Sequence, residues 1–209
     1  MSARDAWAGL DPVWQECFRL AWEAFQEGST PVGAVLVSAD GTVVRTGRNR
    51  RNGRTGYPPG ELAGSNIAHA EINALATLPF GSYTDHVLYT TLEPCLLCAA
   101  AVRYSHIGTV RFAARDPLWY GIGQLPELNH HLARWWPVWE GPLDGPWQTW
   151  AAVLHLLAIV ERGSAAALEG YAQAMPEELH LARRLADPGL RALNQPEALD
   201  KVWDEIEPR

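Results

Sequence analysis

Strand-like and helical patterns alternate along the middle of the chain, and this alternation limits the fold more than any other feature. Two apolar runs joined by Asp40-Gly41 favour a β-hairpin. Further along, two more strand-like runs each follow a helical segment. In chain order the segments are residues 31–38, 42–47, 69–78, 86–91, 95–104 and 108–113. Strands separated by helices predict an α/β protein, with a sheet covered by helices on both faces.

The flanking segments have different characters. Asp11-Pro12 is typical of a helix start, and apolar residues at helical spacing predict a helix over residues 12–27. Residues 48–67 are rich in Gly, Pro, Asn and Arg, which predicts a long loop. Beyond residue 116 the chain is irregular and rich in tryptophan, and helical patterns follow from residue 147. We therefore predict two parts: an α/β domain over residues 1–145 and a helical C-terminal extension over residues 146–209 packed on it.

Composition is that of a globular protein, with 47% hydrophobic and 20% charged residues. No apolar run approaches membrane-spanning length, and the first residues lack the pattern of a signal peptide, so a soluble cytoplasmic protein without membrane contact is expected. Three cysteines are too few for a disulfide framework. In a reducing compartment they are buried, catalytic or metal-bound.

The net charge of −7 arises entirely in the second half, since residues 116–209 hold seven basic and fourteen acidic residues. A nucleic-acid partner usually requires a positive face, so this balance disfavours one without excluding it. One basic cluster lies in the predicted loop and its approach, and a solvated loop is the more common role for such a cluster than a phosphate site. Its members are Arg45, Arg48, Arg50, Arg51 and Arg54.

The residues that indicate chemistry begin two of the predicted helices. His69 and Glu71 are two residues apart in "SNIAHAEINAL", and residues at that spacing serve one site only where a helix is starting. Cys95 and Cys98 follow Pro94 in "TLEPCLLC", so both thiols are expected on one face at a helix N-terminus. A Cys-x-x-Cys pair alone fits a metal site, a redox pair or simple packing.

One histidine and two cysteines form a ligand set that suits zinc. Cys17, the third cysteine, is predicted on the buried face of the first helix. With three protein ligands a fourth position stays open for water, which is typical of a catalytic zinc, and zinc lowers the pKa of that water from about 15.7 towards about 7. Glu71 is then the group that carries protons to the substrate and the leaving group.

The order H-x-E followed by P-C-x-x-C is the signature of zinc nucleobase deaminases. With "PVGAVLV" and "IGTVRFAARD" at family spacing, the chain resembles the cytidine and deoxycytidylate deaminase superfamily over about residues 12–132. The resemblance is strongest to its tRNA-adenosine and guanine deaminase branch. It implies a three-layer α/β/α sandwich with a central mixed sheet, one Zn²⁺ per subunit and a homodimer.

The resemblance also implies roles for individual residues. His69, Cys95 and Cys98 match the zinc ligands, and Glu71 matches the proton carrier. Four more positions match or adjoin substrate contacts: the side chain of Asn49, the backbone N–H of Ala70, the carbonyl of Pro94 and the side chain of Asp116. Independently of the resemblance, Trp119 follows the last predicted strand, and its aromatic ring suits either a pocket wall that stacks on a heterocycle or the core.

The chain departs from the tRNA enzymes in a longer loop between Asn49 and His69 and in an acidic, tryptophan-rich extension instead of a basic C-terminal helix. We therefore predict a zinc-dependent hydrolase that deaminates a free nucleobase, nucleoside or related cyclic amidine and releases ammonia. Editing of adenosine in tRNA is the alternative within enzymes. A catalytically silent zinc-containing binding protein is the alternative of another class. Trp135, Trp136 and Trp139 are expected to dock the extension or to form an oligomer contact.

Overall fold

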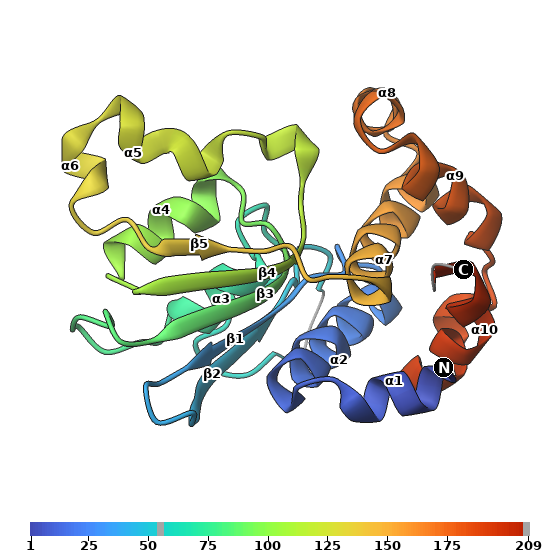
Figure 1. The fold of residues 1–209 in the computed structure, drawn as a ribbon, viewed down its shortest axis with the longest axis horizontal. Coiled ribbons are helices and arrows are strands. Elements are labelled where there is room, and N and C mark those ends of the chain that lie inside the picture. Colours follow the sequence, from blue (N-terminus) through green and yellow to red (C-terminus); the bar gives the residue numbers. More distant parts are fainter. Residues whose placement is uncertain (54–56, 207–209) are drawn as a thin grey trace.

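The computed structural model describes residues 1–53 and 57–206, and these residues form one mixed five-stranded sheet flanked by helices (Figure 1). The strand order is β2-β1-β3-β4-β5. Strand β1 is antiparallel to β2 and β3, whereas β3, β4 and β5 are parallel. The strands are β1 (Gly33–Val37), β2 (Val43–Arg48), β3 (Val87–Leu92), β4 (Thr109–Ala114) and β5 (Val138–Glu140). The predicted α/β fold and its first four strands are confirmed.

The helices that were predicted before residue 116 are present within a few residues of their expected bounds. The Asp11 side chain caps α2 by accepting from the N–H of Val13 at 2.8 Å. The α-helices are α1 (Ala3–Gly9), α2 (Pro12–Gln26), α3 (Ala70–Leu75), α4 (Leu96–Tyr104), α5 (Leu125–Leu128), α6 (His130–Ala133), α7 (Pro146–Arg162), α8 (Ala165–Ala174), α9 (Pro176–Leu185) and α10 (Gln195–Ile206). Short 3-10 helices follow at Pro117–Trp119, Ile122–Gln124 and Leu190–Ala192.

Two glycines show that helices cover opposite faces of the sheet. A Cβ on Gly33 of β1 would lie 2.1 Å from the Cys17 carbonyl oxygen of α2. A Cβ on Gly47 of β2 would lie 2.2 Å from the Ala70 carbonyl oxygen of α3. Gly47 pairs with Ala34, the neighbour of Gly33, and adjacent residues of a strand face opposite sides. Helix α2 therefore packs on one face and α3 on the other, and glycine permits both close approaches.

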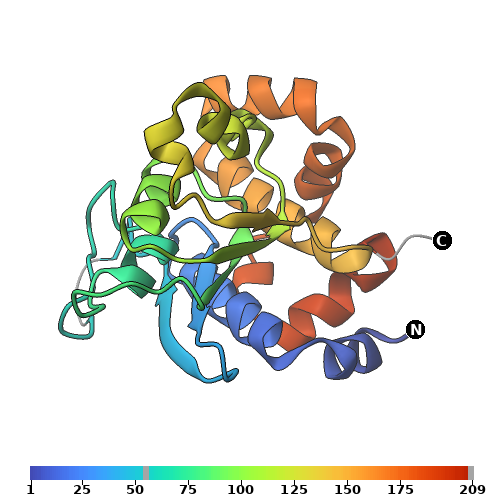
Figure 2. The same cartoon turned by 60° about the vertical axis from the view of Figure 1, so that its left-hand side comes forward.

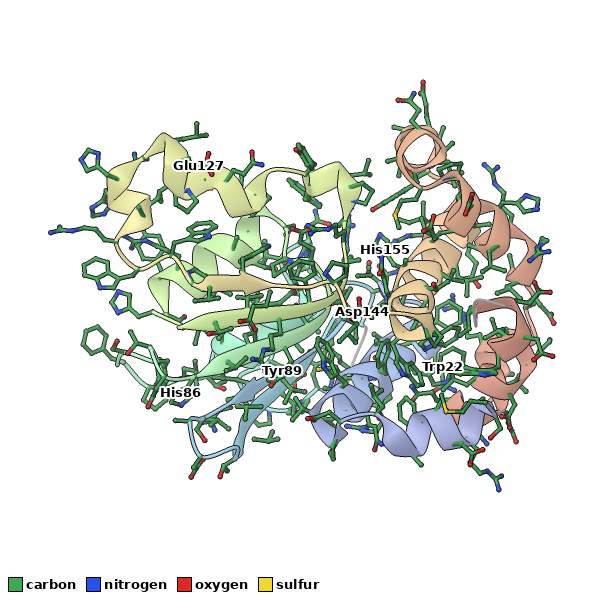
Figure 3. The ribbon with its side chains drawn as sticks, viewed as in Figure 1. Trp22, His86, Tyr89, Glu127, Asp144 and His155 are labelled. Atoms are coloured by element: carbon green, nitrogen blue, oxygen red, sulfur yellow. The ribbon has the colours of Figure 1, made fainter. Side chains whose placement is uncertain are left out.

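The C-terminal helices join the face that α2 covers. Trp147 and Trp150 at the start of α7 pack against Phe18 and Trp22 of α2, with ring centroids 5.7 and 6.0 Å apart. Trp22, labelled in Figure 3, also donates from Nε1 to the Leu193 carbonyl at 3.2 Å. A single hydrophobic cluster includes buried residues of the sheet, of α2 and of the extension. The division at residue 145 remains a prediction.

Helix α1, which the sequence patterns did not indicate, lies beside α10 in both views of the fold (Figures 1 and 2). The Trp203 indole of α10 donates from Nε1 to the Met1 carbonyl at 2.8 Å. The first and last helices of the described chain thus contact each other. Within residues 1–53 and 57–206, no helix is both long and apolar enough to cross a membrane.

The loop predicted over residues 48–67 has no helix or strand in its described part beyond the end of β2. Asn73 of α3 holds it in place, because its side chain accepts from the N–H of Leu62 at 2.8 Å and donates to the Arg48 and Leu62 carbonyls at 3.0 and 3.1 Å. Arg50 pairs with Glu61 across the loop. These contacts fix a loop that approaches the helix starts described next.

Candidate active site

A cavity of about 300 Å³ lies where β3 and β4 end and α3 and α4 begin. The carboxyl ends of parallel strands are the usual place for a site in α/β folds. Its walls come from four parts of the chain: the segments around β1 and β2, the starts of α3 and α4, the segment after β4, and helices α7 and α8. The lining includes Thr30, Asn49, Arg51, His69, Glu71, Glu93, Cys95, Asp116, Trp119, His155, Arg162 and Tyr171.

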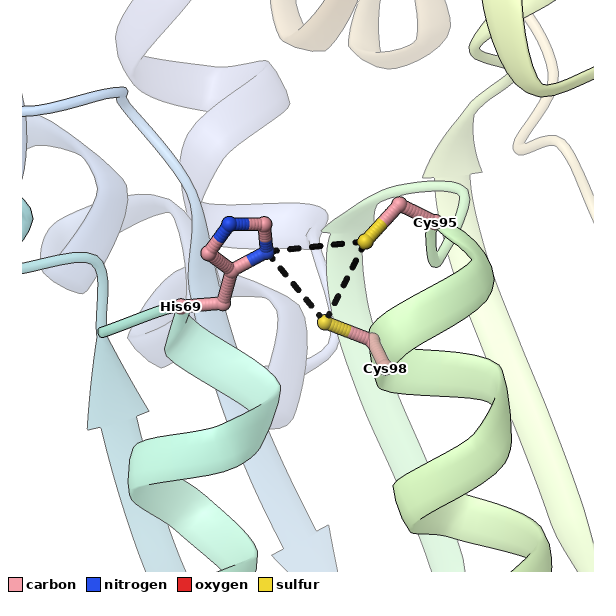
Figure 4. A group of neighbouring side chains, drawn as sticks. All are labelled: His69, Cys95 and Cys98. Carbon is pink, nitrogen blue, oxygen red and sulfur yellow. Dashed lines mark hydrogen bonds between the residues drawn. The ribbon is translucent and has the colours of Figure 1, made fainter. Parts of the chain in front are cut away.

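The side chains of the three predicted zinc ligands, His69, Cys95 and Cys98, lie together (Figure 4). His69 Nδ1 is 3.6 Å from Cys95 Sγ and 3.4 Å from Cys98 Sγ, and the two sulfurs are 3.7 Å apart. A tetrahedral zinc ion with usual bond lengths separates two sulfurs by about 3.8 Å and a nitrogen from a sulfur by about 3.6 Å. The triad therefore fits zinc in both the chemistry of its donors and their spacing.

Helix starts explain why residues so close in sequence serve one site. His69 is the N-cap of α3, with φ −78° and ψ 157°, and Cys95 is the N-cap of α4, with φ −68° and ψ 174°. Extended backbone at an N-cap lets the side chain lie past the helix end, while the next residues begin the helix. Glu71 lies in the first turn of α3 and Cys98 in the first turn of α4, and their side chains extend to the same ligand cluster.

Glu71 lies beside the triad and is 4% exposed. The Thr90 hydroxyl lies 3.4 Å from Glu71 Oε1 and 3.2 Å from the Leu92 carbonyl oxygen, and its single proton is donated to one of these acceptors at a time. The Cys98 thiol lies 3.3 Å from Glu71 Oε2. Burial, followed by the charge of Cys95, raises the pKa of the Glu71 carboxyl. A carboxyl with a raised pKa holds a proton more readily than an ordinary glutamate, which suits a group that accepts and returns protons.

The two thiols of the triad differ. A hydrogen bond from Cys98 lowers the pKa of the Cys95 thiol to about 4, whereas that same hydrogen bond and burial raise the pKa of Cys98. The hydrogen bond with Cys95 also raises the pKa of His69. Cys95 is accordingly held as the thiolate, the form that binds a metal cation.

The predicted substrate residues lie at or next to the cavity. Asn49 is 3% exposed, and its Oδ1 accepts from the N–H of Arg51 at 3.0 Å; among the described residues its Nδ2 has no partner. Asp116 and Trp119 line the cavity as well. Ala70 and Pro94 are not lining residues, although the neighbours His69, Glu71, Glu93 and Cys95 are. Their proposed contacts with substrate stay predictions.

Residues of the extension complete the cavity wall, and no sequence pattern indicates them. His155 and Arg162 come from α7 and Tyr171 from α8. Tyr171 donates from its hydroxyl to Asp116 Oδ1 at 2.9 Å, and His155 Nε2 lies 2.9 Å from the same hydroxyl oxygen. His155 is labelled in Figure 3 on α7. A tyrosine 55 positions beyond its partner leaves no local pattern that sequence reasoning can detect.

Burial sets the protonation of this network. Burial raises the pKa of Asp116 to about 6, although the hydrogen bond from Tyr171 opposes the rise. Burial lowers the pKa of His155 to about 3, so its imidazole is neutral. With Tyr171 donating to Asp116, the tyrosine oxygen accepts from Nε2–H of His155. The network thus fixes one wall of the cavity in a defined hydrogen-bonding state.

The substitution Tyr171→Phe is expected to destabilise the protein more at high pH than at low pH. The pKa of Asp116 is about 6 in the folded chain against 3.8 ordinarily, so the folded state loses stability as pH rises from about 4 through about 6. Removing the tyrosine hydroxyl raises that pKa further and leaves the buried carboxylate with the Leu118 N–H but without its tyrosine donor, at a cost of about 1–3 kcal/mol. Thermal unfolding at about pH 5.5 and about pH 8 measures the difference.

The matched control is Tyr104→Phe, which removes a hydroxyl from a tyrosine that is 76% exposed. It is expected to leave the unfolding temperature unchanged at both pH values. An equal loss of stability for Tyr171→Phe at the two pH values would contradict the bond to an ionised Asp116.

Other sequence predictions have mixed outcomes. Cys17 is fully buried, as expected. The ring contacts of Trp135, Trp136 and Trp139 are with His106, with Phe112 and with one another, whereas Trp147 and Trp150 make the aromatic contacts between α7 and α2. The place of Trp135, Trp136 and Trp139 in an oligomer contact remains a prediction. Arg54, one member of the basic cluster, lies outside the described residues.

Comparison with known proteins agrees with the fold and the triad. The solved structure of a mutant of the protein NE0047 in complex with 8-azaguanine superposes with a TM-score of 0.51 at 19% identity, covering 73% of this chain and 96% of that one. This likeness shows the fold. The family model for the cytidine and deoxycytidylate deaminase zinc-binding region matches residues 11–114.

Curated relatives agree with this match. The tRNA-specific adenosine deaminase of Bacillus subtilis is 36% identical over 118 residues, which cover 54% of this chain and 67% of that protein. The cytosine deaminase of Candida albicans is 35% identical over 85 residues, covering 39% and 51%. A tRNA(Ile)-lysidine synthase of Deinococcus radiodurans is 33% identical over 130 residues, covering 60% of this chain and 21% of the relative. The chain belongs to the cytidine and deoxycytidylate deaminase family.

The share of these relatives that the chain spans differs widely. It spans about half of the cytosine deaminase and about a fifth of the lysidine synthase. What those proteins act on is therefore a basis for a proposal about this chain and no more.

Proposed function

We propose that this protein is a zinc-dependent hydrolytic deaminase of a free nucleobase, a nucleoside or a related small amino-heterocycle. The observation that carries the proposal is the His69, Cys95 and Cys98 triad at tetrahedral spacing, with the Glu71 carboxylate beside it in a cavity of about 300 Å³. Zinc held by these residues would act as the Lewis acid that makes water nucleophilic at neutral pH.

The chain's own residues then move the protons. Glu71 accepts a proton from the attacking water as the water oxygen bonds to the carbon that bears the exocyclic amine. It delivers that proton to the adjacent ring nitrogen, then takes the remaining proton of the added hydroxyl and passes it to the amine nitrogen, so that ammonia leaves as the carbonyl forms. Thr90, when its hydroxyl donates to Glu71 Oε1, orients the carboxylate. We assign Asn49, through its unpartnered Nδ2, to an acceptor atom of the heterocycle.

Ammonia release tests the proposal. The zinc-loaded protein is expected to release ammonia from at least one compound in a panel of adenine, guanine, cytosine, their nucleosides and nucleotides, aminopterins and amino-triazines. Chelation of zinc is expected to abolish the release, and adding zinc back to restore it. If none of these compounds releases ammonia, the proposal that the substrate is a free small molecule is rejected.

Editing of adenosine in tRNA is the second candidate, because the similarity to tRNA-specific adenosine deaminases covers about half of this chain. The acidic second half, with fourteen acidic against seven basic residues over 116–209, argues against a large polyanion as substrate. A tRNA-binding assay at several salt concentrations separates the two candidates. We also propose that the protein is a cytoplasmic homodimer. Measuring its molar mass in solution tests whether it is a dimer.

A further inference from the structure

We propose that Arg51 and Arg162 form a subsite for an anionic group of the substrate, and that the substrate is accordingly a phosphorylated small amino-heterocycle. Arg51 comes from the loop after β2 and Arg162 from the end of α7, in the extension. Because the subsite adjoins Glu71, its role rests on the deaminase function proposed above.

Both arginines border the catalytic cavity and a second hollow next to it. The second hollow has a volume of about 800 Å³ and shares Arg51, Ile159, Arg162 and Ala167 with the first. Its remaining lining is polar, with Asn52, Ser65, Asn66 and Ser164. A ligand whose ring lies beside Glu71 therefore has room for a polar substituent in the second hollow, which both arginines line.

Neither arginine has an acidic ion-pair partner among residues 1–53 and 57–206. No ion pair among the described residues includes Arg51 or Arg162, whereas Arg48 and Arg50, beside Arg51 in sequence, pair with Glu23, Glu27 and Glu61. An arginine that forms an ion pair with a carboxylate of the same protein serves the structure of the protein. Two arginines that lack carboxylate partners beside a catalytic cavity are available for an anion from solution.

Hydrogen bonds hold both guanidinium groups in place and leave donors free. Arg162 donates from Nε to the Ala158 carbonyl and from Nη1 to Thr30 Oγ1, both at 3.0 Å. Arg51 donates from Nε to Asn66 Oδ1 at 3.0 Å. Among the described residues, Nη2 of Arg162 and both terminal nitrogens of Arg51 have no partner. Fixed forks with free terminal N–H groups match the oxygens of a phosphate.

The two positive charges also lie close enough to affect each other. Burial lowers the pKa of Arg162, and the charge of Arg51 lowers it further. Like charges held together cost free energy unless an anion lies between them. Ser164, which lines the hollow, is the N-cap of α8, so the positive end of that ten-residue helix adds to the same potential.

A small phosphorylated compound fits this arrangement better than RNA. An RNA chain needs a row of basic residues along its backbone, and the part of the chain that supplies Arg162 is predominantly acidic. Two arginines beside a bounded cavity suffice for one phosphate group.

Binding to a catalytically silent protein tests the subsite without turnover. The zinc-loaded full chain carrying Glu71→Gln is titrated by calorimetry with adenosine, guanosine and cytidine, with their 5′-monophosphates, with inorganic phosphate and with an RNA stem-loop. At least one monophosphate is expected to bind about tenfold or more tightly than its nucleoside, and inorganic phosphate is expected to compete with it. Adding Arg162→Gln or Arg51→Gln is expected to weaken monophosphate binding about 10- to 100-fold and nucleoside binding less than about twofold.

The control is Arg183→Gln, which removes the same charge from an exposed position of α9 that lines neither hollow. It is expected to change no affinity. Should Arg162→Gln disturb folding, Arg51→Gln still tests the subsite from the other side of the cavity. Equal affinity for nucleoside and monophosphate, an equal effect of Arg183→Gln, or binding of the stem-loop alone would each overturn the proposal.

Ammonia release by the unmodified protein separates failure of the subsite from failure of the function. Phosphate-dependent binding without ammonia from any compound leaves the subsite in place and rejects the deaminase function. Release from nucleosides with no preference for their monophosphates rejects the subsite and leaves the deaminase function in place.

Discussion

Glu71→Gln is expected to lower kcat by about 10²- to 10⁴-fold while zinc stays bound at its normal ratio. Glutamine keeps the size of the side chain and can still accept from the Thr90 hydroxyl, but it carries no proton between water and the leaving nitrogen. Because the three ligand atoms are contributed by His69, Cys95 and Cys98 alone, the metal content is expected to stay the same. Steady-state kinetics and metal analysis on one preparation measure both quantities.

The same substitution is expected to leave the protein at least as stable as before. Glu71 is almost completely buried and burial raises its pKa, so its ionised form costs free energy that a neutral amide avoids. Glu127→Gln, at an exposed position on α5, is the control for loss of a carboxylate elsewhere. Full activity in Glu71→Gln would reject the role of Glu71, and loss of zinc would show that Glu71 supports the metal instead.

A chain that ends at residue 145 is expected not to fold. Helix α7 places Trp150, Leu154 and Leu157 in the core with 0–1% exposure, and it packs against both the sheet and α2. Truncating one such side chain costs about 3–5 kcal/mol, and a whole domain is stable by only about 5–15 kcal/mol. Loss of the entire helix exceeds that margin. Circular dichroism and limited proteolysis of the zinc-loaded fragment measure the outcome.

The single substitution Leu154→Ala in the full chain provides the comparison, with an expected loss of about 2–5 kcal/mol and a fold that persists. Cooperative unfolding of the fragment 1–145 would contradict the expectation. It would establish residues 1–145 as a domain that folds by itself, which is the division predicted from composition.

That His69, Glu71, Cys95 and Cys98 lie together could be predicted because their sequence signal is local. Ligands at the starts of two helices, with a proline before Cys95 and a glutamate two residues after His69, occur within short stretches whose spacing carries the chemistry. The order of strands and helices was predictable for a similar reason, since periodicity reports which face of each segment is buried. Helix α2 and strands β1 to β4 all follow from such patterns.

The elements and site residues that the sequence did not reveal depend on contacts between segments far apart in the chain. Strand β5 has only three residues, too few for an alternating pattern to be distinguished from the irregular chain around it. Helix α1 is seven residues long and lies against α10, almost two hundred positions away. The wall formed by His155, Arg162 and Tyr171 depends on how the extension folds back onto the body, and no periodicity encodes that placement.

The proposed metal ligands and proton carrier lie within residues 69–98, whereas a large part of the cavity wall comes from residues 155–171. Selection can therefore act on the two separately. Substitutions confined to α7 and α8 can exchange one substrate for another while the reaction itself is inherited unchanged. In the laboratory, the same separation makes these two helices the natural target for redirecting the enzyme toward new heterocycles.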